Sequence, residues 1–279
     1  MTEVKCYHAM YRCLREVQDE TGVKWDTQDD RTRKFIEDSD KADLDNFEMK
    51  TKWALEAKQI NDFLSSEGFD IRLNEWEQPP PPAIRFGVAA VLKILADWLG
   101  TAKKTSVMYE GTNYDAFELD QPFIIIESPH YSVPIARISM KNGDSLYLFP
   151  KDEDINMDRL PHILRSTKNI GNCHTLICPK VSYNKEEDMK WMIGMCGQAN
   201  AKYQYVEIEQ AVLQNKFELN EVGARVESAA AIQCFVSGCA GNFTPPSKYI
   251  INRPFYAILR RGEDFYFSGY FDTDTWSKE

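Results

Sequence analysis

Apolar residues near the start of the chain recur every three or four positions, the spacing of one face of a helix. Cys6, Met10, Cys13, Leu14 and Val17 follow this spacing, and charged residues occupy the far side. The pattern predicts an amphipathic helix with its apolar face toward a core.

Four segments with different patterns follow. Residues 22–46 are polar and acidic, and we expect a solvated connection there. From 47 to 66 the apolar residues again recur with helical spacing, which predicts a second amphipathic helix that ends at Gly68. The stretch "QPPPPA" (78–83) predicts a stiff extended spacer, because proline has a fixed backbone angle and no amide donor. Residues 86–99 are too apolar to lie outside a core, so we expect one domain to continue across the spacer.

Beyond residue 104 the pattern changes to short segments typical of strands, separated by turn residues and prolines. The predicted strands are "TSVMYEG", "NYDAFEL", "FIIIES", "ARISMK", "SLYLFP" and "TLICPKVSY". Short helices are expected at "DRLPHILRST" and at "EEDMKWMIGMCG", which begins with acidic residues and ends at Gly197. The aromatic-rich end, "RPFYAILRRGEDFYFSGYF", predicts a hairpin. Helices mixed with antiparallel strands indicate the α+β class, in a single domain over residues 1–279.

The segment "FELNEVGARVESAAAIQ" (217–233) carries two conflicting signals. From Gly223 onward every second residue is small or apolar, as in a strand with one buried and one solvated side. These positions are Ala224, Val226, Ser228, Ala230, Ile232, Cys234 and Val236. Asn220, Glu221 and Gly223, however, are poor strand residues, and glycine permits backbone angles that other residues avoid. The residues alone leave both a strand and an exposed loop open.

Charge and composition narrow the class of protein. The 33 basic and 43 acidic residues give a net charge of −10, which opposes binding to nucleic-acid phosphates or anionic lipid. No apolar run reaches the roughly 20 residues that span a bilayer, and the start lacks the apolar core of a signal peptide. The 7 cysteines form no CxxC pair and suit a reducing compartment. We expect a cytoplasmic protein with no nucleic-acid or membrane partner, with unconventional secretion left open.

The sequence shows no pattern of a catalytic or metal site. His8, His130, His162 and His174 are scattered, without the spacing of metal ligands. There is no G-x-S-x-G elbow and no phosphate-binding glycine loop. Cys173 and His174 are adjacent, so in a strand they point to opposite faces and do not pair as nucleophile and base. We therefore expect no enzyme, no metal site and no cofactor.

Several segments, taken in order, resemble the serpins, a superfamily of serine protease inhibitors. The similar segments are "KQINDFLSSEG", "AAVLKILADWLG", "TSVMYEGTNYDAFELDQPFIIIESPHY", "SLYLFPKDEDINMDRLPHIL", "LICPKVSYNKEEDMKWMIGMCG", "AVLQNKFELNEVGARVESAAA" and "NRPFYAILRRGEDFYFSGYF". They cover about residues 47–271. The resemblance implies a serpin-like α+β fold: a large, mainly antiparallel sheet, a long central strand ending at Trp98, and a C-terminal β-hairpin.

In inhibitory serpins an exposed reactive-centre loop serves as bait for a protease. The protease cleaves the loop as far as the acyl-enzyme, and the freed loop then inserts into the main sheet and distorts the protease. The resemblance implies such a loop at about residues 223–247. The hinge at its start would comprise Glu221, Gly223, Ala224, Val226, Ser228, Ala229 and Ala230. Small alternate side chains would point into the core on insertion, whereas Arg225 and Glu227 would stay in water.

Two scissile bonds fit the loop. Counting from the hinge gives Ser237–Gly238, and counting back from the prolines gives Asn242–Phe243. Neither places a basic residue or an aspartate at the cut. The expected partner is therefore a serine or cysteine protease other than a trypsin-like enzyme or a caspase.

The chain also departs from the family. Serpins normally carry three more helices and a strand before the matched part, including a helix beneath the opening point of the sheet, so we expect an N-terminally shortened member. The asparagine usual in the central strand falls at Ala90, and the histidine usual before the hinge falls at Gln214. We expect the polar network there to be lost. An alternative function is therefore a non-inhibitory serpin-fold protein that binds a partner without trapping a protease.

Overall fold

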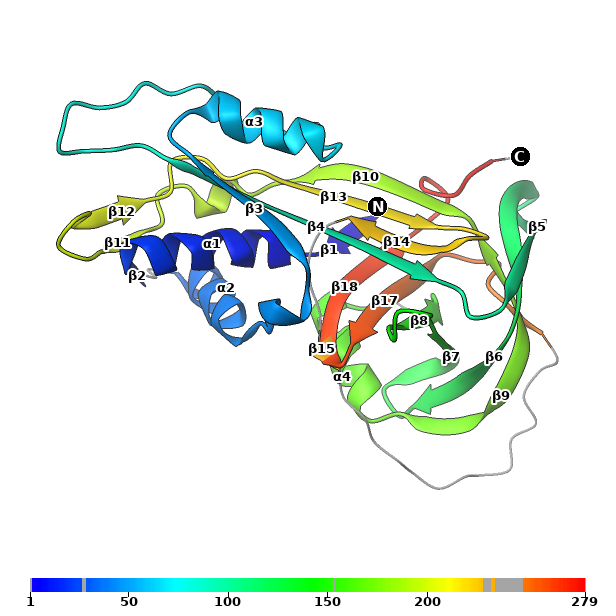
Figure 1. The fold of residues 1–279 in the computed structure, drawn as a ribbon. Helices are drawn as coiled ribbons and strands as arrows, with labels where there is room; N and C mark the ends of the chain where they lie inside the picture. The colour runs from blue at the N-terminus through cyan, green and yellow to red at the C-terminus, as the bar shows by residue number, and fades with distance from the viewer. Residues whose placement is uncertain (1, 27–28, 153, 228–231, 234–247, 279) are drawn as a thin grey trace.

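Two large sheets form the framework of the chain (Figure 1). The structure is a computed structural model, and it describes residues 2–26, 29–152, 154–227, 232–233 and 248–278.

The first sheet has five strands in the order β10–β13–β14–β4–β3, and every neighbouring pair is antiparallel. Its strands are β3 (Met49–Ala54), β4 (Gly87–Asp97), β10 (Val181–Glu187), β13 (Leu213–Leu219) and β14 (Gly223–Glu227). Because β14 lies between β13 and β4 and is antiparallel to both, those two strands run in the same direction.

The second sheet has ten strands. Its main path is β1–β18–β17–β8–β7–β6–β9–β16, with β15 paired to β18 and β5 paired to β6. Its strands are β1 (Glu3–Lys5), β5 (Thr101–Tyr109), β6 (Thr112–Ser128), β7 (Tyr131–Ser139), β8 (Ser145–Pro150), β9 (Lys168–Pro179), β15 (Ile232–Gln233), β16 (Tyr249–Ile250), β17 (Phe255–Arg261) and β18 (Glu263–Phe271). A small third sheet joins β2 (Lys24–Asp26), β11 (Cys196–Gln198) and β12 (Tyr205–Glu207).

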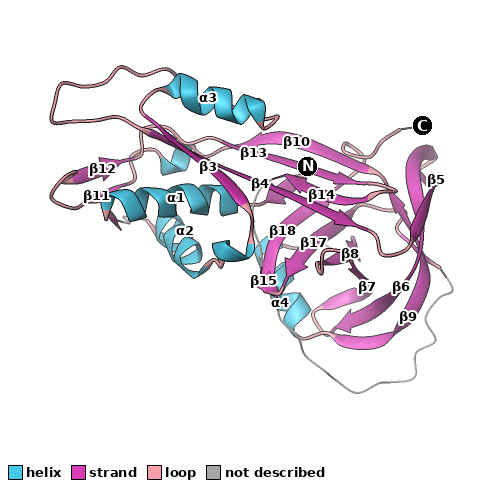
Figure 2. Cartoon of the chain, viewed as in Figure 1, coloured by secondary structure: helices cyan, strands magenta, loops and turns pink. Residues whose placement is uncertain are grey.

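Helices cover both faces of the five-stranded sheet (Figure 2). The helices are α1 (His8–Thr21), α2 (Asp30–Lys41), α3 (Ala57–Ser66) and α4 (Leu160–Arg165), with 3₁₀ turns η1 (Leu44–Asn46), η2 (Met157–Arg159) and η3 (Lys190–Met192). On one face, Ile60 and Leu64 of α3 pack with Ala89 and Val91 of β4. On the other face lie α1 and α2. Among the described residues, no helix combines the length and the apolar character needed to cross a membrane.

The main core lies between the two large sheets. Phe217 of β13 stacks on Phe267 and Phe271 of β18, with ring centroids 4.4 and 4.9 Å apart. Ala224 and Val226 of β14 belong to the same cluster. The central strand β14 is thus packed into the core and not laid on its surface.

The structure confirms the α+β class and several predicted elements. Helix α1 matches the first periodic segment, and the apolar stretch at 86–99 contains strand β4. The predicted terminal hairpin is β17–β18, which turns at Gly262, and the expected short helix at "DRLPHILRST" contains η2 and α4.

The expectation for residues 22–46 was wrong, and the helix expected over 47–66 is confirmed only from Ala57 to Ser66. The first segment contains α2, whose N-cap Asp29 accepts hydrogen bonds from the backbone N–H groups of Arg31 and Thr32. Phe35 then anchors this helix in the core. The second segment begins as strand β3, and its helix starts at Ala57. The period of two in β3 is short, so the longer helical spacing concealed it.

Two further expectations were also wrong. Residues 78–83 do not form an extended spacer, because the backbone N–H of Ala83 donates to Pro80 O at 3.2 Å and closes a turn. The predicted helix at "EEDMKWMIGMCG" is confined to the short η3; its acidic start, Glu186 and Glu187, lies in β10. These carboxylates mark a solvated strand edge and not a helix N-terminus.

Helix α1, which the sequence predicted, lies against the five-stranded sheet. It packs against β4 on the face opposite α3, and the thiol of Cys13 donates to Val88 O at 3.7 Å. Strand β1, which precedes it, pairs with β18. The first residues of the chain therefore support both sheets.

Candidate functional site

The turn that leads into β14 is held by contacts from three segments. The indole N–H of Trp98 donates to Asn220 O at 2.9 Å, and the side chain of Asn220 accepts from the N–H of Val222. Glu221 lies 2.9 Å from Lys180, and its pKa is below the ordinary value because its own N–H and Lys180 donate to the carboxylate. A Cβ added at Gly223 would collide with the carbonyl oxygen of Ala96, so glycine is needed for this close approach.

Strand β14 has the two faces that the alternation indicated. Ala224 and Val226 are buried at 0% and 1% exposure, and Arg225 between them is exposed. Val226 stands opposite Ile94 of β4 on one side and Phe217 of β13 on the other. Small and medium side chains fit here because the strand is paired on both edges and packed against the core.

Strand β14 ends before the sheet does. Its last residue, Glu227, pairs with Lys93 of β4 and Lys216 of β13. Beyond this point, among the described residues, positions 87–92 of β4 pair with β3 alone and positions 213–215 of β13 pair with β10 alone. We call the gap between these two strand segments the slot.

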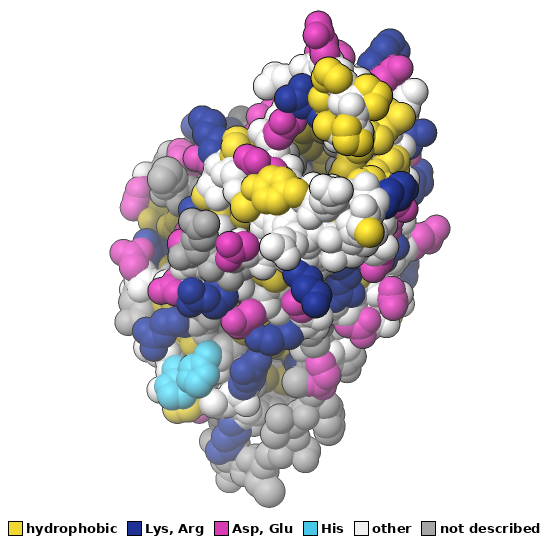
Figure 3. Space-filling view, turned by 90° about the vertical axis from the view of Figure 1, so that its left-hand side faces the viewer, with side chains coloured by type: hydrophobic (Ala, Val, Ile, Leu, Met, Phe, Trp, Pro, Cys, Tyr) yellow, Lys and Arg dark blue, Asp and Glu magenta, His cyan; other side chains and the backbone are white. Residues whose placement is uncertain are grey.

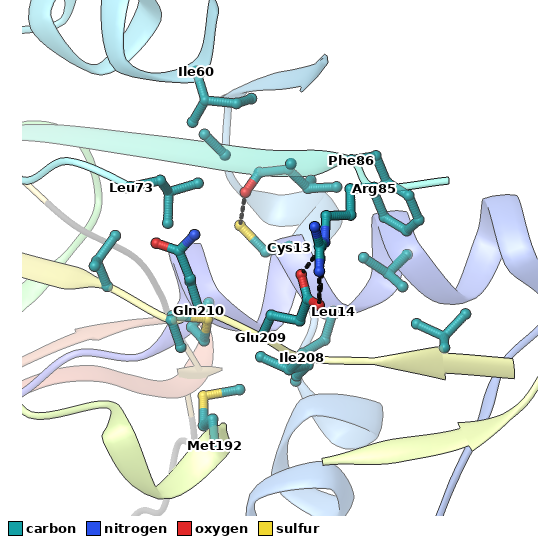
Figure 4. A pocket seen from close by; sticks show the side chains of 18 of the residues that line it. Cys13, Leu14, Ile60, Leu73, Arg85, Phe86, Met192, Ile208, Glu209 and Gln210 are labelled. Carbon is teal, nitrogen blue, oxygen red and sulfur yellow. Dashed lines mark hydrogen bonds and ion pairs between the residues drawn. The ribbon is translucent and has the colours of Figure 1, made fainter. Parts of the chain in front are cut away.

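A cavity of about 630 Å³ occupies the slot. Its walls come from both faces of the sheet: Figure 4 shows Ile60 of α3 on one side of β4 and Cys13 and Leu14 of α1 on the other. Toward the top of Figure 3, the side on which the loop after α3 lies, hydrophobic side chains gather around a hollow. The partly exposed Ile84, at 44%, and Tyr205, at 55%, line this cavity.

The polar network expected to be lost beside Gln214 is replaced. Gln214 is 5% exposed, and its Oε1 accepts from the backbone N–H of Asp70 at 2.9 Å. Its Nε2 donates to Asn184 Oδ1 at 2.6 Å. The Gln214 side chain therefore forms a polar network of its own within the sheet. Its partners differ from the asparagine and histidine that the resemblance implied.

The next residue, Asn215, is incompletely satisfied. It is 1% exposed, and its Nδ2 lies 3.3 Å from Glu187 Oε1. Its Oδ1 is buried with no hydrogen-bond partner among the described residues. A buried acceptor of this kind costs free energy until a donor reaches it. Asn215 borders the slot on the core-facing side, the side of its strand neighbour Phe217.

Paired side chains link the two segments that flank the far end of the slot. Arg85, just before β4, meets Glu209 with Nε–Oε2 and Nη2–Oε1 distances of 2.9 and 3.1 Å. Asn74 and Gln210 exchange two hydrogen bonds, of 2.7 and 3.1 Å. The sequence analysis missed these pairs because their members are more than 120 positions apart. The polar Asn215 at a core-facing position of an alternating strand was the one available signal for the slot.

The other candidate residues lie outside the described residues. They are Ser228, Ala229, Ala230, Ser237, Gly238, Asn242 and Phe243. The hinge role of the described ones, Glu221 to Val226, stays a prediction. Within the described part of the chain, no group of three or more His, Cys, Asp or Glu side chains could hold a metal ion.

The fold matches solved structures over nearly its whole length. A loop-inserted structure of a cleaved ovalbumin mutant has a TM-score of 0.60 at 12% identity, covering 97% of this chain and 93% of that one. Serpin48 of the insect Tenebrio molitor gives 0.54 at 15% identity, covering 96% and 91%. Thyroxine-binding globulin in complex with thyroxine gives 0.55 at 10% identity, covering 99% and 93%. No protein-family model and no curated protein matches the sequence.

Proposed function

We propose that this chain, which has the serpin fold, inhibits a protease through a reactive-centre loop that inserts into the slot after cleavage. One observation carries the proposal: β14 is already a central strand, antiparallel to both neighbours, and the slot continues in line beyond its end. On this proposal the loop begins at β14, and the slot provides the space for its remainder in the same sheet.

The register of β14 predicts how the remainder would fit. Since Glu227 pairs with Lys93 and Lys216, the next residue, Ser228, would stand opposite Leu92 and Asn215. Directly opposed residues share a face, so the Ser228 hydroxyl would reach the unsatisfied Oδ1 of Asn215. Insertion would thereby supply the donor that this buried acceptor lacks.

Ala230, two positions further along, would stand opposite Ala90 and Leu213 by the same register. An inserted strand of small residues would form backbone hydrogen bonds with both β4 and β13. It would also cover apolar side chains that line the cavity. Backbone pairing and apolar burial both favour the inserted state.

The chemistry of trapping belongs to the protease. Its serine or cysteine nucleophile attacks the carbonyl at the scissile bond, the acyl–enzyme bond forms, and the new amine end leaves. We retain Ser237–Gly238 and Asn242–Phe243 as the candidate bonds. Insertion of the acylated segment would then carry the protease across the sheet before water hydrolyses the ester or thioester. A trypsin-like enzyme or a caspase does not suit either bond.

A second candidate function is partner binding without trapping. The position of β14 in the uncleaved chain favours this function. Residues 223–227 already lie in the sheet, so they do not belong to the exposed part of the loop that a protease would bind. The similar thyroxine-binding globulin structure, solved with thyroxine, indicates that this fold can carry a ligand.

Loop cleavage tests the proposal. Chymotrypsin would be used at low ratio, with the site of cutting located by mass, and thermal unfolding would be followed before and after. Insertion predicts a clear rise in melting temperature on cleavage, and an active inhibitor also gives a protease complex that survives denaturant. An unchanged melting temperature together with no such complex would leave partner binding as the function.

A further inference from the structure

Two histidines that are far apart in the sequence meet beside the turn between β6 and β7. His130 lies in this turn, and His162 lies in α4. Their ring centroids are 5.2 Å apart, and the ring planes are tilted by 31°. Both residues are exposed, and Figure 3 shows histidine side chains gathered at one place on the surface. The two rings are therefore accessible to an ion from solvent.

One buried hydroxyl holds the backbone beside both histidines. Ser128 is 3% exposed, and its Oγ accepts from the backbone N–H of His130 at 3.2 Å. The same Oγ donates to the carbonyl oxygen of Ile163, the residue after His162, at 3.0 Å. Ile163 packs in the same apolar cluster as Tyr131, the residue after His130. Both backbones are thus fixed before a ligand arrives, which lowers the entropy lost on binding.

The separation of the rings matches that of two ligands on one tetrahedral ion. A zinc ion lies about 2.0–2.1 Å from a ligating imidazole nitrogen, and therefore about 3.2 Å from the centroid of the ring. Two rings bound at a tetrahedral angle then have their centroids about 5.2 Å apart. This is the distance between the rings of His130 and His162. The two imidazoles therefore need no change in separation to share an ion.

The ligand types at the pair define the class of ion. Imidazole nitrogen suits zinc, copper and nickel, whereas calcium and magnesium require several oxygen ligands. In the part of the chain that the structure describes, no third His, Cys, Asp or Glu side chain completes a metal-binding group. The pair therefore suits a small transition-metal ion and offers calcium or magnesium no carboxylate from these residues.

We propose that His130 and His162 bind a zinc ion, with water molecules in the remaining coordination positions. The ion joins the β6–β7 turn to α4 through side chains, in addition to the backbone contacts made by Ser128. An ion that binds the folded chain and not the unfolded one stabilises it by mass action. The site thus acts as a zinc-dependent clamp on α4, and it does not depend on the proposed loop insertion.

Thermal unfolding with and without zinc chloride measures the clamp. At a zinc concentration about 100-fold above the dissociation constant, the melting temperature of the uncleaved full chain should rise by roughly 5 °C. The same concentration of magnesium chloride should leave it unchanged. His130→Ala and His162→Ala should each abolish the rise while keeping the metal-free melting temperature, because both residues are exposed. The matched control His174→Ala also removes an exposed histidine and should keep the rise.

Cobalt(II) replaces zinc as a spectroscopic probe of the ligands. Its visible absorption should show one-to-one binding at a tetrahedral site, without a thiolate charge-transfer band. His162→Cys exchanges one imidazole for a thiolate, so it should keep binding and add that band. A thiolate band in the unaltered chain would assign the ion to cysteines and overturn the site. No zinc-induced rise in melting temperature, or a rise that survives in both His130→Ala and His162→Ala, would also overturn it.

Discussion

The two halves of β4 belong to one continuous strand, yet their surroundings differ. From Lys93 to Asp97 the strand is paired with β14, which joins it to β13, and core-facing Ile94 and Ala96 are almost fully buried. From 87 to 92 it is paired with β3 alone and borders the cavity. Both halves of β4 carry buried apolar side chains on their core-facing side. The difference arises from where β14 stops, because the edge of β4 that faces β13 is paired only from 93 to 97.

We call the part of the sheet at residues 93–97 of β4, where β14 pairs with it, the closed half, and the part at residues 87–92 the open half. The largest effect is expected from a charge in the closed half. Val226→Asp would place a carboxylate between Ile94 and Phe217, and an unpaired buried charge costs about 3–5 kcal/mol. The melting temperature of the uncleaved protein should fall by roughly 10 °C. Leu95→Asp is the matched control, since Leu95 is 60% exposed on the same sheet and lies beside Arg225. Equal losses for the two variants would show that β14 is not held in the core.

An aspartate placed in the open half should affect the melting temperature only after cleavage. Ala230→Asp should leave the uncleaved melting temperature unchanged, because the proposed insertion of this residue follows cleavage. It should abolish the rise on cleavage, since insertion would bury the carboxylate. Ala240→Asp, beyond a chymotrypsin cut at Phe235, is the control and should keep the rise. A full rise in Ala230→Asp would contradict the register that continues β14 into the slot.

A smaller effect is expected from Asn215 Oδ1, the buried acceptor that has no hydrogen-bond partner among the described residues. Asn215→Leu removes the buried Oδ1 and should stabilise the uncleaved protein by about 1 kcal/mol. In the cleaved protein, Ser228→Ala should cost about 1 kcal/mol with Asn215 present and almost nothing with Leu in its place. This double-mutant cycle would be measured by denaturant unfolding. An equal cost of Ser228→Ala in both backgrounds would refute the predicted Ser228–Asn215 hydrogen bond.

The smallest effect concerns the turn that starts the closed half. The pKa of Glu221 is lowered in the folded protein, so its stabilisation is present above its unfolded pKa near 4.5 and is lost as pH falls through the folded value. Since the Glu221 side chain is 25% exposed and Gln keeps one acceptor oxygen, Glu221→Gln should cost about 1 kcal/mol at pH 7. Melting temperatures of the two proteins should converge as the pH falls below the folded pKa of Glu221. A gap that stays constant with pH would show that the charge is not what stabilises the turn.

The sequence predicted the closed half better than the open one. A period of two over Ala224–Val226 and a long apolar run at 86–99 are local signals: the first indicated a strand or an exposed loop, and the second indicated a core segment, for which the resemblance implied a strand. The segment at 47–66 misled because β3 and α3 follow each other within it. The acidic residues Glu186 and Glu187 were read as a helix start, although they form a strand edge.

The open half depends on contacts between distant positions. The cavity exists because β4 and β13 lack a common partner strand over part of their length. These two strands lie far apart in the sequence. Nothing local in "GVAAVL" distinguishes a filled gap from an empty one, and in "LQN" the polar Asn215 at a core-facing position is the one local signal. The Arg85–Glu209 pair likewise joins residues 124 positions apart, beyond the reach of any periodic pattern.

The pairing of Gly223 with Asp97 also fixes an order of events during synthesis. At about 5–20 residues per second, the partner strand of β4 leaves the ribosome roughly 6–25 seconds after β4 itself. Throughout that interval β4 can pair with β3, which is made first, whereas its other edge waits. The five-stranded sheet is therefore completed only after β14 has been synthesised, and a late segment determines when a sheet begun much earlier can close.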